Sequence, residues 1–266
     1  MRGFAIAIMA LCAGPAIAAA QDGASQQGAA QKLSGVWDRG AIAGTPFRPR
    51  DGLLGPVMRI QGRDVEGTQL GDYNAPILQP WAAAIVKKRT DNDAAGIFQA
   101  EAKETCSPMG VPHVLQLNGP IMLLIGQDVA VITYMRAMQA RIIHMNKPHP
   151  TDLKTSYYGH SVGHWDGDTL VVDTIGFNDK TPVDMFGTPH TERLHVVERY
   201  HLIEGGKTLR ADFTVEDPGA FTTQWASFAD YGTPRAPYEP ELVCAENNRM
   251  PDGSLVPGPI DTTPDF

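Results

Sequence analysis

A histidine and an aspartate at strand-like spacing carry the clearest acid–base chemistry in the sequence. Asp166-Gly167 is a strong two-residue turn signal within residues 157–175. With that turn, His160 lies opposite Asp173 on a β-hairpin, and opposed side chains approach to about 5 Å at Cβ. An imidazole held beside a carboxylate is arranged for proton transfer. We therefore take His160 and Asp173 as candidate catalytic residues, and the alternatives are a structural hydrogen bond or an exposed pair on the outer face.

The same pattern predicts which side chains of this hairpin share a face. One face carries Tyr158, His160, Val162, His164, Thr169, Val171, Asp173 and Ile175. The other face carries Gly159, Ser161, Gly163, Trp165, Leu170, Val172 and Thr174. Both faces hold apolar residues, so the pattern leaves open which of them points inward.

A further carboxylate stands out between residues 193 and 217. This segment predicts a hairpin that turns at Gly205-Gly206. Its apolar face carries Leu194, Val196, Glu198, Tyr200, Leu202, Leu209, Ala211, Phe213 and Val215. A buried glutamate is costly unless it is paired, and desolvation is one way to make a general acid or base that works near neutral pH. Glu198 is therefore the third candidate catalytic residue, and a Glu at a barrel mouth or bonded to an arginine is the alternative.

Five other polar side chains are candidates for substrate contact. Tyr158 and Tyr200 lie on the predicted faces of His160 and Glu198, and their hydroxyls can bond a phenol or a carboxylate. Asn178, His190 and Glu192 lie between the two hairpins, where loops often border a barrel mouth. The alternative for the loop residues is that they cap turns.

The sequence offers no motif for a metal or a cofactor. His160 and His164 have H-x3-H spacing, but on a strand they lie about 13 Å apart, too far to share one zinc ion. There is no G-x-S-x-G, Walker A, H-E-x-x-H, C-x-x-C or strand-linked G-x-G-x-x-G motif. We therefore expect no bound metal and no cofactor.

The elements around these residues favour a mainly β fold. Residues 120–125 and 129–135 predict another hairpin of buried strands, and residues 75–88 predict one short helix. Several hairpins with a single helix and long loops indicate an antiparallel barrel or sandwich. We expect one domain over residues 33–250 and a Pro-rich tail over 251–266.

The start of the chain predicts export to the periplasm or beyond. Residues 1–20 combine Arg2, a short apolar run and small residues before a predicted cleavage site, which is typical of a signal peptide. Residues 21–32 are small and polar and predict a flexible leader. In an oxidising compartment Cys106 and Cys244 predict a disulfide, with two buried thiols as the alternative.

The charge composition limits the classes of binding partner that we expect. The chain has 22 Lys and Arg residues against 30 Asp and Glu, a net charge of −8, without a basic run. A nucleic-acid surface requires clustered cations, and anionic membranes repel acidic surfaces. We expect neither nucleic-acid binding nor membrane insertion after signal cleavage. The sequence does not decide whether the chain forms a homodimer.

Several blocks resemble a large bacterial family of exported proteins. The main block is residues 159–174, GHSVGHWDGDTLVVDT, and further blocks are residues 189–192, 195–199 and 214–218. Cys106-x-Pro-x-Gly and Cys244-x-Glu-Asn also match. The family commonly has a basic residue where this chain has His164, which implies a peripheral role for His164 beside His160 and Asp173.

Two looser resemblances suggest a fold and a reaction. Residues 35–37, Gly-Val-Trp, resemble the opening G-x-W of lipocalin-like barrels, which enclose one small apolar ligand. The chain is also similar to cofactor-independent lyases and decarboxylases that act on lignin-derived phenolic biaryls. These resemblances imply a lipocalin-like enzyme that uses His160, Asp173 and Glu198 on a small aromatic compound. A non-catalytic carrier for such a ligand and a structural envelope protein are the alternatives.

Overall fold

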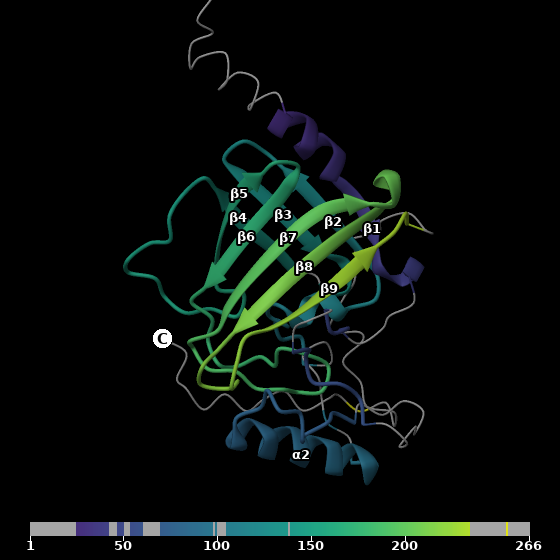
Figure 1. Cartoon of the computed structure of the whole chain (residues 1–266), viewed down its shortest axis with the longest axis vertical. Helices are drawn as coiled ribbons and strands as arrows, with labels where there is room; N and C mark the ends of the chain where they lie inside the picture. Colours follow the sequence, from purple (N-terminus) through teal and green to yellow (C-terminus); the bar gives the residue numbers. More distant parts are fainter. Residues whose placement is uncertain are drawn as a thin grey trace, which may run out of the picture.

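Nine strands form one sheet that curls into a nearly closed barrel (Figure 1). The computed structural model describes residues 25–42, 47–50, 54–60, 70–97, 99, 105–137, 139–234 and 254. The strands follow one another in the sheet in sequence order. They are β1 Gly35–Asp38, β2 Pro120–Ile125, β3 Val129–Tyr134, β4 Gln139–Met145, β5 His160–Asp166, β6 Thr169–Ile175, β7 His195–Ile203, β8 Thr208–Glu216 and β9 Trp225–Tyr231. The prediction of a mainly β barrel is confirmed.

The two edges of the sheet meet at a single bridge. The Asp38 amide donates to the Gly232 carbonyl at 2.9 Å, and the Gly232 amide donates to the Asp38 carbonyl at 3.0 Å. The sheet is antiparallel except between β4 and β5, which pair in parallel. The connection over residues 146–159 carries the chain back along the barrel before β5 begins, which a parallel pair requires.

The three predicted hairpins are present, and one of them differs in register. The structure pairs β2 with β3, β5 with β6, and β7 with β8. In the β5–β6 hairpin Asp166 pairs with Thr169, so the turn is Gly167-Asp168 rather than Asp166-Gly167. Gly167 has a φ of 58°, which suits the first position of a two-residue turn. Because the register shifts by two residues, the predicted faces of β5 and β6 are unchanged. Tyr158 is the exception: it was predicted on the face of His160, but it precedes β5 and stacks on buried Tyr134, because Gly159, with its positive φ, interrupts the alternation.

Two α-helices lie at opposite ends of the barrel in the described part of the chain (Figure 1). Helix α2 covers Pro80–Ala94, a few residues beyond the predicted 75–88. Residues 25–33 are also helical, although residues 21–32 were expected to be a flexible leader. Ala29 and Leu33, four residues apart, are 4% and 1% exposed, so burial of this stripe stabilises the helix.

Short 3-10 turns connect other elements, and a few predicted features fall outside the description. The turns are η1 Arg39–Ile42, η2 His113–Gln116, η3 Met135–Ala137 and η4 Glu204–Gly206.

None of the described helices has the length and apolar character needed to cross a membrane. The predicted signal peptide and Cys244 lie outside the described residues, as does all but residue 254 of the predicted tail. The Cys106–Cys244 disulfide therefore stays a prediction.

The inward faces of the strands build the core. On β7 and β8 the predicted inward set is confirmed, with Val196, Glu198, Tyr200, Leu209, Ala211, Phe213 and Val215 buried. On β5 and β6 the inward face is the one with Ser161, Gly163, Leu170, Val172 and Thr174. The face with His160 and Asp173 is therefore the outer one.

A glycine before β5 gives a direct test of this packing. Gly159 has a φ of 64°, and a Cβ there would lie 2.5 Å from the Ile175 carbonyl oxygen. We expect Gly159→Ala to lower the free energy of unfolding by about 2–4 kcal/mol, because strain and the clash add. Urea unfolding measures this change.

The matched control is the turn glycine of the same hairpin. Gly167 has a similar φ of 58°, but nothing lies within 4 Å of a Cβ placed there. Gly167→Ala should therefore cost only the backbone strain, about 1–2 kcal/mol. Equal losses in the two variants would show that the contact with β6 contributes nothing.

Candidate functional site

A buried arginine inside the barrel links four neighbouring strands. Arg141 of β4 is 2% exposed. Its Nε donates to Ser161 Oγ of β5 at 2.9 Å, and its Nη2 donates to Thr174 Oγ1 of β6 at 2.6 Å. The same Nη2 is 2.5 Å from Oε2 of Glu198 on β7, whose exposure is 0%. These contacts fix the guanidinium rigidly in the barrel interior.

Three tyrosines accompany this ion pair. The Tyr200 hydroxyl donates to Glu198 Oε1 at 2.6 Å, so both carboxylate oxygens have a partner. Tyr134 and Tyr158 stack with ring centroids 6.2 Å apart and planes 12° from parallel. We call Tyr134, Arg141, Tyr158, Glu198 and Tyr200 the inner cluster. It includes three of the predicted site residues: Glu198, Tyr158 and Tyr200.

Burial keeps the inner cluster's hydrogen-bond donors protonated. Desolvation raises the pKa of Tyr134 to about 12 and raises the pKa of Tyr158 still further. Burial also raises the pKa of Tyr200, and the neighbouring Glu198 carboxylate adds to this rise. Desolvation acts against the charge of Arg141, but the Glu198 carboxylate together with Tyr134 and Tyr200 outweighs it, and the pKa of Arg141 is raised. At neutral pH all four side chains carry N–H or O–H donors.

Three of these donors make no well-formed hydrogen bond among the described residues, although Tyr134 interacts with Arg141 and Tyr200, and Tyr158 interacts with the backbone of Met109. They are Arg141 Nη1 and the hydroxyls of Tyr134 and Tyr158, and all three are buried. A buried donor without an acceptor costs about 1–3 kcal/mol, so native proteins usually satisfy it with protein, water or ligand. The interior therefore has an excess of donors, and an acceptor such as a carboxylate, a phenolate or water complements it.

The other predicted catalytic residues belong to a separate cluster on the outer face of the same four strands. His149 Nδ1 lies 2.9 Å from His160 Nδ1, and His149 Nε2 lies 3.0 Å from Asp173 Oδ1. His195 Nε2 lies 3.0 Å from Asp173 Oδ2. His144 stacks on His160 with ring centroids 4.8 Å apart. We call His144, His149, His160, Asp173 and His195 the histidine cluster.

The prediction that His160 pairs directly with Asp173 across the hairpin was wrong. His160 pairs across the strands with Ile175, and Asp173 pairs with Val162, because the turn lies one residue later than expected. His149, from the connection between β4 and β5, bridges the two side chains instead. The sheet separates both residues from Glu198, so the three predicted catalytic residues do not share one site.

The loop residues predicted to touch substrate lie in a third place. His190 is 2% exposed, with Nε2 3.1 Å from Thr181 Oγ1 and Nδ1 2.9 Å from the Thr191 carbonyl oxygen. Asn178 Oδ1 accepts a hydrogen bond from the Lys180 amide at 3.2 Å. These contacts tie the loop, as the alternative interpretation expected. Glu192, which is exposed, and His190, which is buried, line a cavity of about 520 Å³ beside Trp81 of α2.

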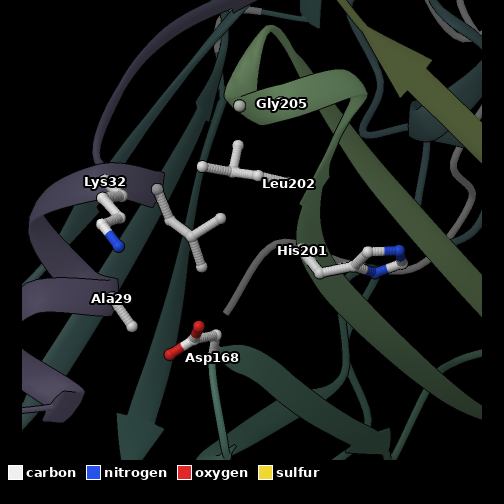
Figure 2. Close-up of a pocket in the computed structure, with 8 residues that line it drawn as sticks. Ala29, Lys32, Asp168, His201, Leu202 and Gly205 are labelled. Atoms are coloured by element: carbon white, nitrogen blue, oxygen red, sulfur yellow. The ribbon is translucent and has the colours of Figure 1, made fainter.

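Two cavities flank the helical residues 25–33 at one end of the barrel. Figure 2 shows the first, of about 320 Å³, between Ala29 and Lys32 of the helix, Asp168 of the β5–β6 turn, and His201 and Leu202 of β7. The second, of about 470 Å³, lies between this helix and the β2–β3 turn. This helix therefore rests on the barrel end with open space on both sides.

Comparisons with known proteins identify no relative of this chain. Family models, curated proteins and solved structures all give no match to this chain. Within the described part of the chain, no group of three or more His, Cys, Asp or Glu side chains is placed to hold a metal ion. The functional interpretation therefore rests on the geometry.

Sequence reasoning missed Arg141, Tyr134, His149 and His195. Arg141 alternates with Ile143 and Met145 along β4, so a cation on an otherwise apolar face was a visible signal. A buried Glu198 also requires a cation as its partner. His149 had no such signal, because a loop residue reaches the sheet only through the fold.

Proposed function

We propose that this protein is a cofactor-independent lyase that decarboxylates or otherwise cleaves a small phenolic aromatic compound inside its barrel. The observation that carries the proposal is the presence of three buried donors without a well-formed hydrogen bond, Arg141 Nη1 and the hydroxyls of Tyr134 and Tyr158, in the same cluster as the Glu198 carboxylate. An aromatic acid supplies the acceptors that these donors lack. The tyrosine rings and the apolar strand residues around them suit its ring.

The chemistry follows from the substrate's own ring. A para-hydroxyl that loses its proton pushes an electron pair through the ring, and the side-chain carbon next to the carboxylate takes up a proton. The resulting quinone methide loses carbon dioxide, and the electrons of the broken C–C bond restore the alkene and the phenolate. Acid–base groups and a dry site suffice for these steps.

The inner cluster divides this work between its members. Arg141, Tyr134 and Tyr158 hold the anionic group of the substrate by hydrogen bonds that are strong in a desolvated site. Glu198 exchanges the proton with the substrate, and Tyr200, bonded to Glu198, orients it. Ser161 and Thr174 position the guanidinium without contacting the substrate.

A non-catalytic carrier is the second candidate. The observation that favours it is that both oxygens of Glu198 are already engaged, by Arg141 and Tyr200. A carrier needs only the unsatisfied donors and the apolar interior. Export through residues 1–20 is part of both proposals.

The test uses the mature chain purified without added metal or cofactor. We would incubate it with hydroxycinnamic acids and phenolic biaryl acids and follow the products by mass spectrometry. Release of carbon dioxide or formaldehyde is the expected result. Binding of an unchanged compound would favour the carrier. The absence of both binding and turnover would contradict both proposals.

A matched pair of variants assigns the turnover to the interior. Glu198→Gln should reduce kcat about 100-fold or more, as expected for loss of a catalytic acid–base group. Glu216→Gln changes an exposed glutamate at the end of β8 and should leave kcat unchanged. Equal activity of the two variants would exclude the inner cluster as the reaction site.

A further inference from the structure

The histidine cluster fastens a long connection to the outer face of the sheet. Residues 146–156 are tied at their ends by backbone bonds, from the Asn146 amide to the Gly163 carbonyl at 2.7 Å and from the Ser156 amide to the Gly176 carbonyl at 3.0 Å. Between these ends, His149 contacts both His160 and Asp173. Leu153 packs at Gly176. The middle of the segment is exposed, and besides His149 the Thr155 hydroxyl donates to Glu192 Oε1 at 3.5 Å.

The contact between His149 and His160 has room for only one proton. Their Nδ1 atoms lie 2.9 Å apart, so one nitrogen donates and the other must accept. Because His149 Nε2 faces the Asp173 carboxylate, it carries the proton that is donated there. The pair can therefore bear at most one positive charge while the contact is intact. A second proton places hydrogens on both Nδ1 atoms and breaks the bond.

Other ionisable groups surround the pair. His144 of β4 stacks on His160, and Asp173 of β6 lies between His149 and His195 of β7. Glu216 of β8 pairs across the strands with His195, and exposed His164 lies on the outer face of β5. The segment itself carries Lys147, Asp152 and Lys154, all of them exposed. Asp173 is the only carboxylate bonded to an imidazole of the pair among the described contacts.

We propose that the histidine cluster is an acid-operated latch that holds residues 147–155 on the outer face of β4–β7 near neutral pH and releases them when the His149–His160 pair takes up a second proton. The latch does not depend on the function proposed for the interior. Its consequence is a connection that opens at mildly acidic pH while the barrel stays folded.

The direction of the pH effect follows from the groups involved. Burial, with His144 and His149 nearby, lowers the pKa of His160 below its ordinary 6.5. The closed latch therefore disfavours a proton on His160 and excludes the second proton of the pair, whereas the released imidazoles can both take up protons, so the closed state loses stability as the pH falls below the ordinary histidine pKa of 6.5. The hydrogen bond with Asp173 raises the pKa of His195, so that bond strengthens over the same range. The hydrogen bond from His195 lowers the pKa of Asp173, which stays ionised there.

Hydrogen exchange of the intact protein tests the latch. We expect amides in residues 147–155, corrected for intrinsic exchange rates, to lose protection between pH 7 and pH 5. Opening that takes up one proton becomes up to about tenfold more favourable per pH unit. Peptides from β7 and β8 should show no change and serve as the internal reference.

Two variants localise the effect. His160→Gln cannot take up the proton and should abolish the pH dependence, whereas His164→Gln, on the same strand and face, should keep it. Nitrogen NMR of the wild-type imidazoles gives a second measurement that needs no variant. The state in which both His149 and His160 carry protons on Nδ1 should appear together with loss of protection. Protection that does not change with pH, or that still changes in the His160→Gln variant, would overturn the proposal.

Discussion

Arg141→Met is expected to destabilise the barrel by about 3–5 kcal/mol, the cost of leaving a buried charge without its partner. Glu198 is fully buried, and Arg141 is the cation bonded to it. Ser161 Oγ and Thr174 Oγ1 lie 3.0 Å apart and can bond to each other once the guanidinium is gone. The loss should therefore come from Glu198 rather than from these hydroxyls. Urea unfolding of the ligand-free protein measures it.

A double variant separates the charge from the packing. Glu198→Gln removes the buried charge while its amide oxygen can still accept the hydrogen bond from Tyr200. The variant with both Arg141→Met and Glu198→Gln should therefore be more stable than Arg141→Met alone. Strict additivity of the two substitutions would mean that the buried pair is not coupled.

An exposed ion pair on the outer face is the control. Arg199 Nη2 lies 2.6 Å from Asp166 Oδ2, and the two side chains are 44% and 61% exposed. Arg199→Met should leave the free energy of unfolding almost unchanged, because solvent screens the exposed pair. The contrast with Arg141 measures what burial adds to the same type of contact.

Tyr134→Phe is expected to reduce turnover about 100- to 1,000-fold while leaving the ligand-free protein as stable as the wild type or slightly more so. The hydroxyl of Tyr134 is buried and makes no well-formed hydrogen bond among the described residues, so removing it reduces a desolvation cost. In the proposed reaction the same hydroxyl donates to the substrate, and loss of one preorganised donor commonly costs about this much in rate. Stability and activity should therefore change independently.

Tyr200→Phe is the matched comparison for this prediction. Its hydroxyl donates to Glu198 Oε1, so the substitution leaves a buried carboxylate oxygen unsatisfied. This variant should lose about 1–3 kcal/mol of stability. If Tyr134→Phe lost as much stability as Tyr200→Phe, the Tyr134 hydroxyl would have a structural partner and the proposed ligand site would lose its main support.

Local sequence patterns were sufficient for much of the fold. Alternation with a period of two separated the faces of β5–β6 and β7–β8 correctly, because successive side chains of a strand point to opposite sides whatever lies around them. Turn signals located the three hairpins, and the apolar face of β7–β8 placed Glu198 inside. The predicted helix over residues 75–88 overlaps α2, which begins five residues later and ends six residues later.

The same patterns could not choose between two faces that are both partly apolar. Val171 is 5% exposed on the outer face of β6, while Leu170 and Val172 are buried on the inner face. Only the curvature of the whole sheet decides which face encloses the core. That choice placed Ser161 and Thr174 beside Arg141 and turned His160 and Asp173 outward.

By itself, the sequence determined the strand alternation, the hairpins and the burial of one carboxylate, because these depend on neighbours within a few residues. Only the tertiary structure decided which distant residues contact each other. Arg141 meets Glu198 across 57 residues, and His149 meets Asp173 across 24. Both contacts depend on the parallel pairing of β4 with β5, which aligns four strands and folds the connection back over them. Contacts between distant residues arise from barrel closure, which no local spacing encodes.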